Sequence, residues 1–198
     1  MSMDSDGDGY YDVLSGFQKS IRGSDVDAAL YYLGIMIEAN DMDSIERRLL
    51  VTAYEDIGLG NPAAVARCVQ AIDAAKRVGF PEGRIPLAMA VIDLTLSPKS
   101  KSAENAIDAV MQTIRNTSYS VPDYLRFTPV NMKEEDKYDY GRADLWAKIQ
   151  YLPDKLKNEK FYMPQMNSSY EKVLAQNLEK LRSVKRTNKL AMLKNNTK

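Results

Sequence analysis

The sequence has no histidine and only one cysteine, Cys68. Without histidine, the chain lacks the commonest general base and the commonest metal ligand. A lone cysteine cannot form an internal disulfide, which favours the cytoplasm, and it cannot complete a cysteine–histidine zinc site. No apolar run approaches the roughly 20 residues that a membrane-spanning helix needs, so we expect no membrane partner.

Phosphate-binding motifs are absent as well. The chain contains no G-x-x-x-x-G-K-[ST] loop, and Gly58-Leu59-Gly60 is predicted to follow a helix rather than a strand, which does not suit a dinucleotide site. We therefore expect no catalytic residue, no cofactor-binding residue and no metal site. The acidic groups Glu55-Asp56 and Glu134-Glu135-Asp136 leave a carboxylate metalloenzyme as a third hypothesis, because helices can bring distant carboxylates together.

Charge of either sign is balanced overall but unevenly distributed. Residues 1–152 contain 16 lysines and arginines against 23 acidic residues, whereas residues 153–198 contain 11 against 4. A basic tail can bind a phosphate backbone or an acidic partner. This distribution supports a second hypothesis, a nucleic-acid-binding module that uses the tail together with Lys99 and Lys101.

Residues 10–116 show the apolar spacing and the capping residues of consecutive helices. The predicted helices cover residues 10–22, 24–39 with Ser24 as the cap, 44–57, 61–78, a segment that starts between Pro81 and Pro86 and ends at Leu96, and 102–116 with Ser102 as the cap. The last of these is expected to bury Ala106, Ile107, Val110, Met111 and Ile114. Short connections predict antiparallel helix pairs, and no fixed repeat supports a solenoid.

The rest of the chain divides into three further regions. Residues 1–9 are rich in Asp, Gly and Ser and are predicted to be a disordered leader. Residues 117–167 are rich in Tyr and Pro, and we expect this irregular segment to pack on the helical body. Residues 168–198 are predicted to be a helix followed by a basic tail that frays from residue 184.

Two segments with unusual charge placement are candidate contact sites. The helix corner formed by Lys19, Arg22, Ser24 and Asp25 either complements two helix dipoles or contacts an anion or a subunit. Glu55 and Asp56 lie at a predicted helix C-terminus, where the dipole disfavours negative charge, so they need a cationic partner. Arg47 and Arg48 on the same helix are candidates for that partner, either within one chain or across an interface.

A third candidate is the segment 97–102, Ser-Pro-Lys-Ser-Lys-Ser. It is either a proline stop followed by a serine cap, or a loop in which Lys99 and Lys101 contact phosphate at a helix N-terminus.

Several ordered motifs resemble the C-terminal region of the AAA+ ATPases called replication-associated recombination protein A, which are related to the Werner-helicase-interacting ATPases. The motifs occupy residues 19–31, 47–49, 55–62, 79–84 and 98–102, and residues 151–153 and 161–164 are similar to the closing motif of the family. The sequence departs from that family near Lys137–Gly141, where members contain a histidine, and at Tyr10, which replaces another.

The resemblance implies an all-α, clamp-loader-collar-like stack of antiparallel helix pairs that forms a homo-oligomer, expected to be a tetramer. It further implies that ATP and Mg²⁺ bind in an N-terminal module absent here, and that the parent acts in replication-fork maintenance and recombination. Its expected partners are DNA and single-stranded-DNA-binding protein, in a cytoplasmic, nucleoid-associated location. The alternative within this family is a module that binds DNA or docks the single-stranded-DNA-binding protein.

Overall fold

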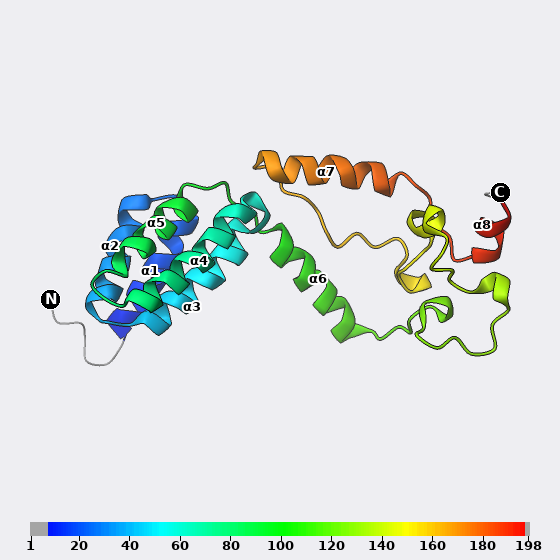
Figure 1. The fold of residues 1–198 in the computed structure, drawn as a ribbon, viewed down its shortest axis with the longest axis horizontal. Helices are drawn as coiled ribbons and strands as arrows, with labels where there is room; N and C mark the ends of the chain where they lie inside the picture. The colour runs from blue at the N-terminus through cyan, green and yellow to red at the C-terminus, as the bar shows by residue number, and fades with distance from the viewer. Residues whose placement is uncertain (1–7, 197–198) are drawn as a thin grey trace. The chain divides into compact units, whose positions relative to one another are not determined.

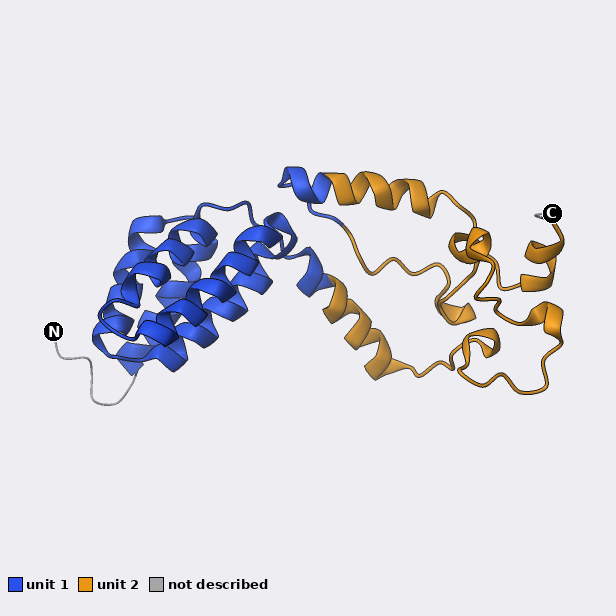
Figure 2. Cartoon of the chain, in the orientation of Figure 1, with its two compact units in different colours: residues 1–105, 164–172 blue, residues 106–163, 173–198 orange. Residues whose placement is uncertain are grey.

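The computed structural model describes residues 8–196, and within that range it is all-helical with no β-strand, as the sequence predicts (Figure 1). The predicted leader lies outside the described residues except for Asp8 and Gly9, which already belong to the first helix. The chain divides into two compact units, which Figure 2 colours separately. Unit 1 contains residues 1–105 and 164–172, and unit 2 contains residues 106–163 and 173–198.

Unit 1 is a stack of helices joined by short turns. Its elements are α1 (Asp8–Arg22), α2 (Val26–Glu38), α3 (Met42–Thr52), a π-helical turn (Ala53–Ile57), a 3-10 turn (Gly58–Gly60), α4 (Pro62–Val78), α5 (Arg84–Thr95) and the first turns of α6 (Ser102–Asn116) and α7 (Ser169–Arg182). Helix α1 packs against α2, α4 against α5, and α2 against α5. The fully buried core includes Phe17, Met36, Leu49, Ile72 and Leu94, one from each of the helices α1 to α5.

Helix ends agree with the sequence at α4 and differ at α2 and α3. Asn61 caps α4 ahead of Pro62, and Gly79 follows its last residue, as predicted. The prediction that Ser24 caps α2 is wrong, because Ser24 takes a positive φ of 61° and the side chain of Asp25 accepts the hydrogen bond from Ala28 N instead. Helix α3 likewise begins earlier than predicted, with Asp41 as its cap.

The apolar faces of α6 and α7 are not buried within the described residues. Ile107, Met111 and Ile114 of α6 are 55%, 40% and 59% exposed, and Val173 of α7 is 63% exposed. The prediction of an inward stripe on α6 is therefore wrong. Helical periodicity shows that one face avoids water, but it does not show that its partner belongs to the same chain.

Unit 2 has a small core of its own. Its backbone contains short 3-10 turns at Asp123–Leu125, Glu134–Asp136, Ala143–Lys148 and Asp154–Leu156, and the helix α8 (Leu190–Asn196). Tyr124, Leu145 and Ile149 of the Tyr/Pro-rich segment pack with Leu190 of α8. The segment is thus held within unit 2 by the C-terminal residues, and its packing on the helical body stays a prediction. Those C-terminal residues, predicted to fray, are held by Leu190 and by backbone hydrogen bonds of Thr187 to Lys148 and Gln150.

No helix within residues 8–196 is both long enough and apolar enough to span a bilayer.

Candidate functional site

The candidate site of unit 1 is a charged cluster centred on the carboxylate of Asp56. This side chain is 1% exposed, and one of its oxygens lies 3.0 Å from Arg22 Nε and 3.0 Å from Lys101 Nζ. The backbone carbonyl of Asp56 accepts a hydrogen bond from Ser100 N at 2.9 Å. Its second carboxylate oxygen has no hydrogen-bond partner among the described residues. Asp56 thus joins the end of α1 to the segment that leads into α6.

The glycines around Asp56 let the backbone approach this segment closely. Gly58 ends the π-helical turn with a φ of 45°, a left-handed conformation that favours glycine. Gly60 lies so close to Pro98 that a side-chain methyl at this position would overlap the proline carbonyl. The motif Gly58-Leu59-Gly60 therefore serves to seat the chain against residues 98–100 rather than to hold a phosphate.

The carboxylates of Glu55 and Glu104 form a pair beside this centre. The hydrogen bond that protonated Glu55 shares with the Glu104 carboxylate, together with burial, raises the pKa of Glu55. Lys101 Nζ lies 3.1 Å from Glu104 and 3.7 Å from Glu55. Burial is the largest single influence on the pKa of Lys101 and lowers it, but hydrogen bonds to Asp56 and Glu104 outweigh burial and leave that pKa raised. Lys101 is therefore a fixed cation shared by three carboxylates.

Lys99 is bound to two carbonyls close to it in the sequence and to a hydroxyl at the α1–α2 corner. Its ammonium donates to the carbonyls of Thr95 and Ser97 at 2.7 and 2.6 Å and to Ser24 Oγ at 3.0 Å. The bond to Thr95 satisfies a carbonyl at the C-terminus of α5, a position where a cation is favourable. Burial lowers the pKa of Lys99. The bonds of Lys99 and Lys101 support the structural interpretation of this segment over the phosphate-contact interpretation.

Beside these lysines, a fully buried glutamate ties the start of α7 to the same segment. The hydroxyls of Ser100 and Ser102 both donate to the carboxylate of Glu171, which is 0% exposed. Ser168 Oγ in turn accepts a hydrogen bond from Glu171 N at 3.1 Å. Ser102 begins α6 but its hydroxyl binds Glu171, so the predicted capping role of this side chain is wrong.

Comparison with known proteins assigns the chain to a family. The family described as MgsA AAA+ ATPase C terminal matches residues 23–182. The chain belongs to this family.

Relatives of the chain include replication-associated recombination proteins and an ATPase. Replication-associated recombination protein A of Bacillus subtilis is 52% identical over 187 residues, which cover 91% of this chain and 44% of that protein. The Haemophilus influenzae protein of the same name is 37% identical, over 90% of this chain and 42% of its own length. ATPase WRNIP1 of Dictyostelium discoideum is 32% identical, over 80% of this chain and 19% of its own length. The chain thus spans less than half the length of these relatives.

In this member of the MgsA C-terminal family, the structure gathers six of the ten candidate residues in one cluster. They are Arg22, Ser24, Glu55, Asp56, Lys99 and Lys101. Asp25 lies beside Ser24 and caps α2.

The remaining three candidates lie apart from the cluster. Arg48 donates to Gln18 Oε1 at 3.2 Å, while Lys19 and Arg47 are exposed. The sequence suggested Arg47 and Arg48 as partners of Glu55 and Asp56, but within this chain neither arginine binds them. The cations that fill this role, Arg22 and Lys101, lie 34 and 45 positions away in the sequence, so helical spacing gives no sign of them.

Glu171 belongs to this cluster but was not predicted from the sequence. The pattern Ser168-x-x-Glu171 is that of a capping box, which would place the glutamate on a backbone amide at the helix start. In the structure its carboxylate reaches two serines some 70 positions earlier.

The cluster contains cations, carboxylates and hydroxyls, but no arrangement suited to metal binding. No group of three or more His, Cys, Asp or Glu side chains within residues 8–196 is placed to hold a metal ion. The charged cluster joins α1, the π-helical turn, the segment 97–102 and the start of α7 within unit 1. What this arrangement can do is hold these segments in one fixed geometry.

Proposed function

We propose that this chain is the oligomerisation collar of a AAA+ ATPase that acts in replication-fork maintenance and recombination, and that it is not catalytic by itself. The names of its relatives, replication-associated recombination protein A and ATPase WRNIP1, support the biological setting. The parent would bind ATP and Mg²⁺ in a module outside this chain and work on DNA with single-stranded-DNA-binding protein, in the cytoplasm at the nucleoid. The partner of the collar would be further copies of itself, in a tetramer.

The observation that carries the proposal is the uncovered apolar stripe of α5. Ile85, Met89 and Ile92 of α5 and its C-cap residue Leu96 recur at intervals of four and three residues and are 56%, 70%, 41% and 63% exposed. The opposite face of the helix is buried in the core through Leu87, Val91 and Leu94. A helix that is apolar on both faces is typical of one that is buried on both faces in its complete assembly.

The stripe borders an apolar groove between α2 and α5. Leu30, Gly34 and Ile37 of α2 and Ala88 and Met89 of α5 line a groove of about 470 Å³. The charged residues of α5 are Arg84 and Asp93, and both Asp93 oxygens already bind Arg67, at 2.7 and 3.1 Å. The groove is therefore predominantly apolar, and Arg84 is the charged residue in its lining.

A second copy of the chain has a suitable occupant. Helix α6 exposes Ile107, Met111 and Ile114 at intervals of four and three residues, which is the spacing that packs into such a groove. A homo-oligomeric collar would cover both apolar surfaces, and apolar area removed from water stabilises association by about 25 cal/mol per Å² before association entropy is subtracted.

The test is the mass of the chain in solution. We expect light scattering at micromolar concentration to give a multiple of 22.3 kDa. The double variant Met89→Glu/Ile92→Glu should shift this mass to one copy while its circular dichroism stays helical. Val51→Glu changes an exposed apolar residue of α3, 46% exposed, and should leave the mass unchanged. A monomeric wild-type chain at this concentration would contradict the proposal.

A further inference from the structure

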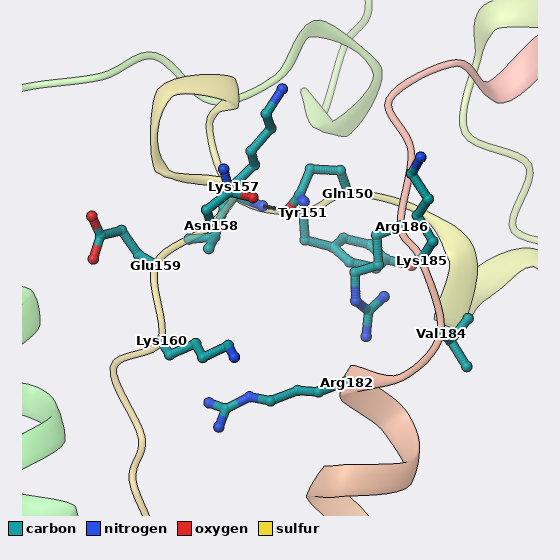
Figure 3. A pocket seen from close by; sticks show the side chains of 11 residues that line it. Gln150, Tyr151, Lys157, Asn158, Glu159, Lys160, Arg182, Val184, Lys185 and Arg186 are labelled. Atoms are coloured by element: carbon teal, nitrogen blue, oxygen red, sulfur yellow. Dashed lines mark hydrogen bonds between the residues drawn. The ribbon is translucent and has the colours of Figure 1, made fainter.

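Unit 2 contains a strongly cationic cavity that the charged cluster of unit 1 does not involve. Its volume is about 740 Å³. Its lining includes five cations, Lys157, Lys160, Arg182, Lys185 and Arg186, and one carboxylate, Glu159. They come from two separate segments, residues 157–160 and 182–186, which form opposite walls (Figure 3).

Three of these cations converge. Figure 3 shows Lys160 and Arg182 extending toward one another from the two walls, with the guanidinium of Arg186 directed into the same space. Glu159 points away from it. Within the described residues, no salt bridge joins a carboxylate to Lys160, Arg182, Lys185 or Arg186, and Lys157 reaches Asp154 only at 3.7 Å.

The two arginines are held in place by uncharged groups. Arg182 donates to the carbonyl of Tyr162 at 2.8 Å, and Arg186 donates to the carbonyl of Ile149 at 3.0 Å. The Arg186 guanidinium also stacks 5.6 Å from the centre of the Tyr151 ring. These contacts orient the guanidinium groups without neutralising them, so the remaining N–H groups stay available to an anion.

We propose that this cavity binds a ligand with two or more phosphate groups. Cations that converge without counter-ions repel one another, and an anion bound between them relieves that repulsion. One phosphate has at most two negative charges, whereas five cations line this cavity, so the lining suits several phosphates. Arginine in particular binds phosphate oxygens in pairs through its planar fork. The phosphates belong to a nucleic-acid strand or to a free nucleotide, and these two sources share the chemistry.

The experiment measures two probes on the complete chain at low salt. Fluorescence anisotropy of a labelled twelve-residue oligothymidylate tests the strand, and fluorescence of a labelled ATP analogue without Mg²⁺ tests the nucleotide. The test variant is Lys160→Glu/Lys185→Glu, because neither side chain makes a hydrogen bond or ion pair with another described residue. The control is Arg115→Glu/Lys133→Glu, which makes the same change in net charge at exposed positions of unit 2 outside the cavity.

We expect one probe to bind and the test variant to weaken it at least tenfold, with the control within twofold of the wild type. If the strand is the ligand, the slope of log affinity against log salt should fall by about 1.4, at about 0.7 for each phosphate that the two replaced lysines neutralise. The probe that binds identifies the source of the phosphates.

Absence of binding for both probes would overturn the proposal, and so would equal weakening in both variants. Displacement by an acidic peptide at a lower concentration than by unlabelled oligonucleotide would also overturn it, in favour of a protein partner. Light scattering on the same samples reports the oligomer separately, so a failure here does not count as a failure of the collar.

Discussion

The ammonium of Lys101 lies 3.0 Å from a carboxylate oxygen of Asp56, a side chain that is 1% exposed at the end of a helical segment. A negative charge at a helix C-terminus is unfavourable, and a buried one more so, unless a cation compensates it. Arg22 and Lys101 both do so from other segments of unit 1. The charge that breaks the local rule is therefore the point at which α1, the π-helical turn and the segment 97–102 are joined.

Replacing Lys101 by methionine keeps the aliphatic stem and removes the ammonium. We expect Lys101→Met to reduce the free energy of unfolding by about 1–2 kcal/mol, because the buried Asp56 loses one of its two cations while the partly exposed Arg22 remains. Urea unfolding followed by circular dichroism measures the change. Lys76→Met is the matched control, since its pair with Glu46 at 3.0 Å is solvent-exposed and should contribute nothing measurable. Equal effects of the two substitutions would show that Asp56 does not depend on Lys101.

The buried carboxylate of Glu171 should contribute more to the free energy of unfolding than a surface carboxylate does. Glu171→Ala removes the acceptor of two buried hydroxyls, those of Ser100 and Ser102, and we expect a loss of about 2–4 kcal/mol in urea unfolding. Adding Ser102→Ala to this variant should cost less than it does in the wild type, because the hydroxyl it removes has already lost its acceptor. Strictly additive losses would argue against the contact.

The sequence predicted those features of this fold that depend on neighbouring residues. Asn61-Pro62 and Gly79 delimit α4 as expected, because capping chemistry acts over three or four positions. Ser24 and Asp25 are both good caps, and only the backbone conformation, with Ser24 at φ 61°, decides between them. Sequence alone does not resolve such a choice.

Features that depend on distant residues were not predictable in the same way. The partners of Asp56 and Glu171 lie between 34 and 71 positions away, and no periodicity connects them. The stripe on α6 is apolar as predicted. Its exposure depends on which surface covers it, and helical periodicity does not identify that surface. The five cations of the unit 2 cavity are visible in the sequence only as a basic tail, and the fold places them around one space.

A substitution at Gly60 tests the close approach between the 3-10 turn and Pro98. Gly60→Ala introduces a methyl that overlaps the Pro98 carbonyl, and we expect it to destabilise the chain by about 1–3 kcal/mol. Gly34→Ala on α2 is the matched control, because no atom of the same chain lies within 4 Å of its added methyl. That substitution should stabilise the helix by up to about 1 kcal/mol. Both glycine variants are compared in the Met89→Glu/Ile92→Glu background, which leaves the groove beside Gly34 unoccupied by a second copy. Thermal unfolding of the two variants should therefore shift in opposite directions.

Cys68 should report unfolding rather than reactivity. Its thiol is buried between helices of unit 1, and burial raises its pKa to about 12, so almost no thiolate is present at neutral pH. We expect the folded chain to resist a thiol reagent at pH 8 and to react once urea unfolds it, whereas rapid labelling of the folded chain would contradict this burial. Val65→Cys on the same helix is not a useful control because it is also buried, but Val78→Cys, at a position 59% exposed, should label at once.

Tyr10 should give unit 1 a stability that depends on pH. Its hydroxyl donates to Asp41 Oδ2 at 2.6 Å, and this hydrogen bond lowers the pKa of Asp41 below its ordinary value. A carboxyl whose pKa is lower in the folded state stabilises that state above the unfolded pKa, near 4, and the contribution disappears as pH falls through the folded pKa.

Tyr10→Phe removes this hydrogen bond but keeps the ring. The tyrosine hydroxyl stays neutral and donates this hydrogen bond throughout the acidic and neutral pH range. The variant should therefore be less stable than the wild type at pH 6. The difference should shrink below pH 3, because Asp41 becomes protonated there. Urea unfolding at the two pH values measures it, with Tyr11→Phe as the control at an exposed position. A difference that stays constant between pH 6 and pH 3 would show that Asp41 does not sense Tyr10. Because Asp41 also caps α3 through Ser44 N at 3.1 Å, the same titration should weaken the start of that helix.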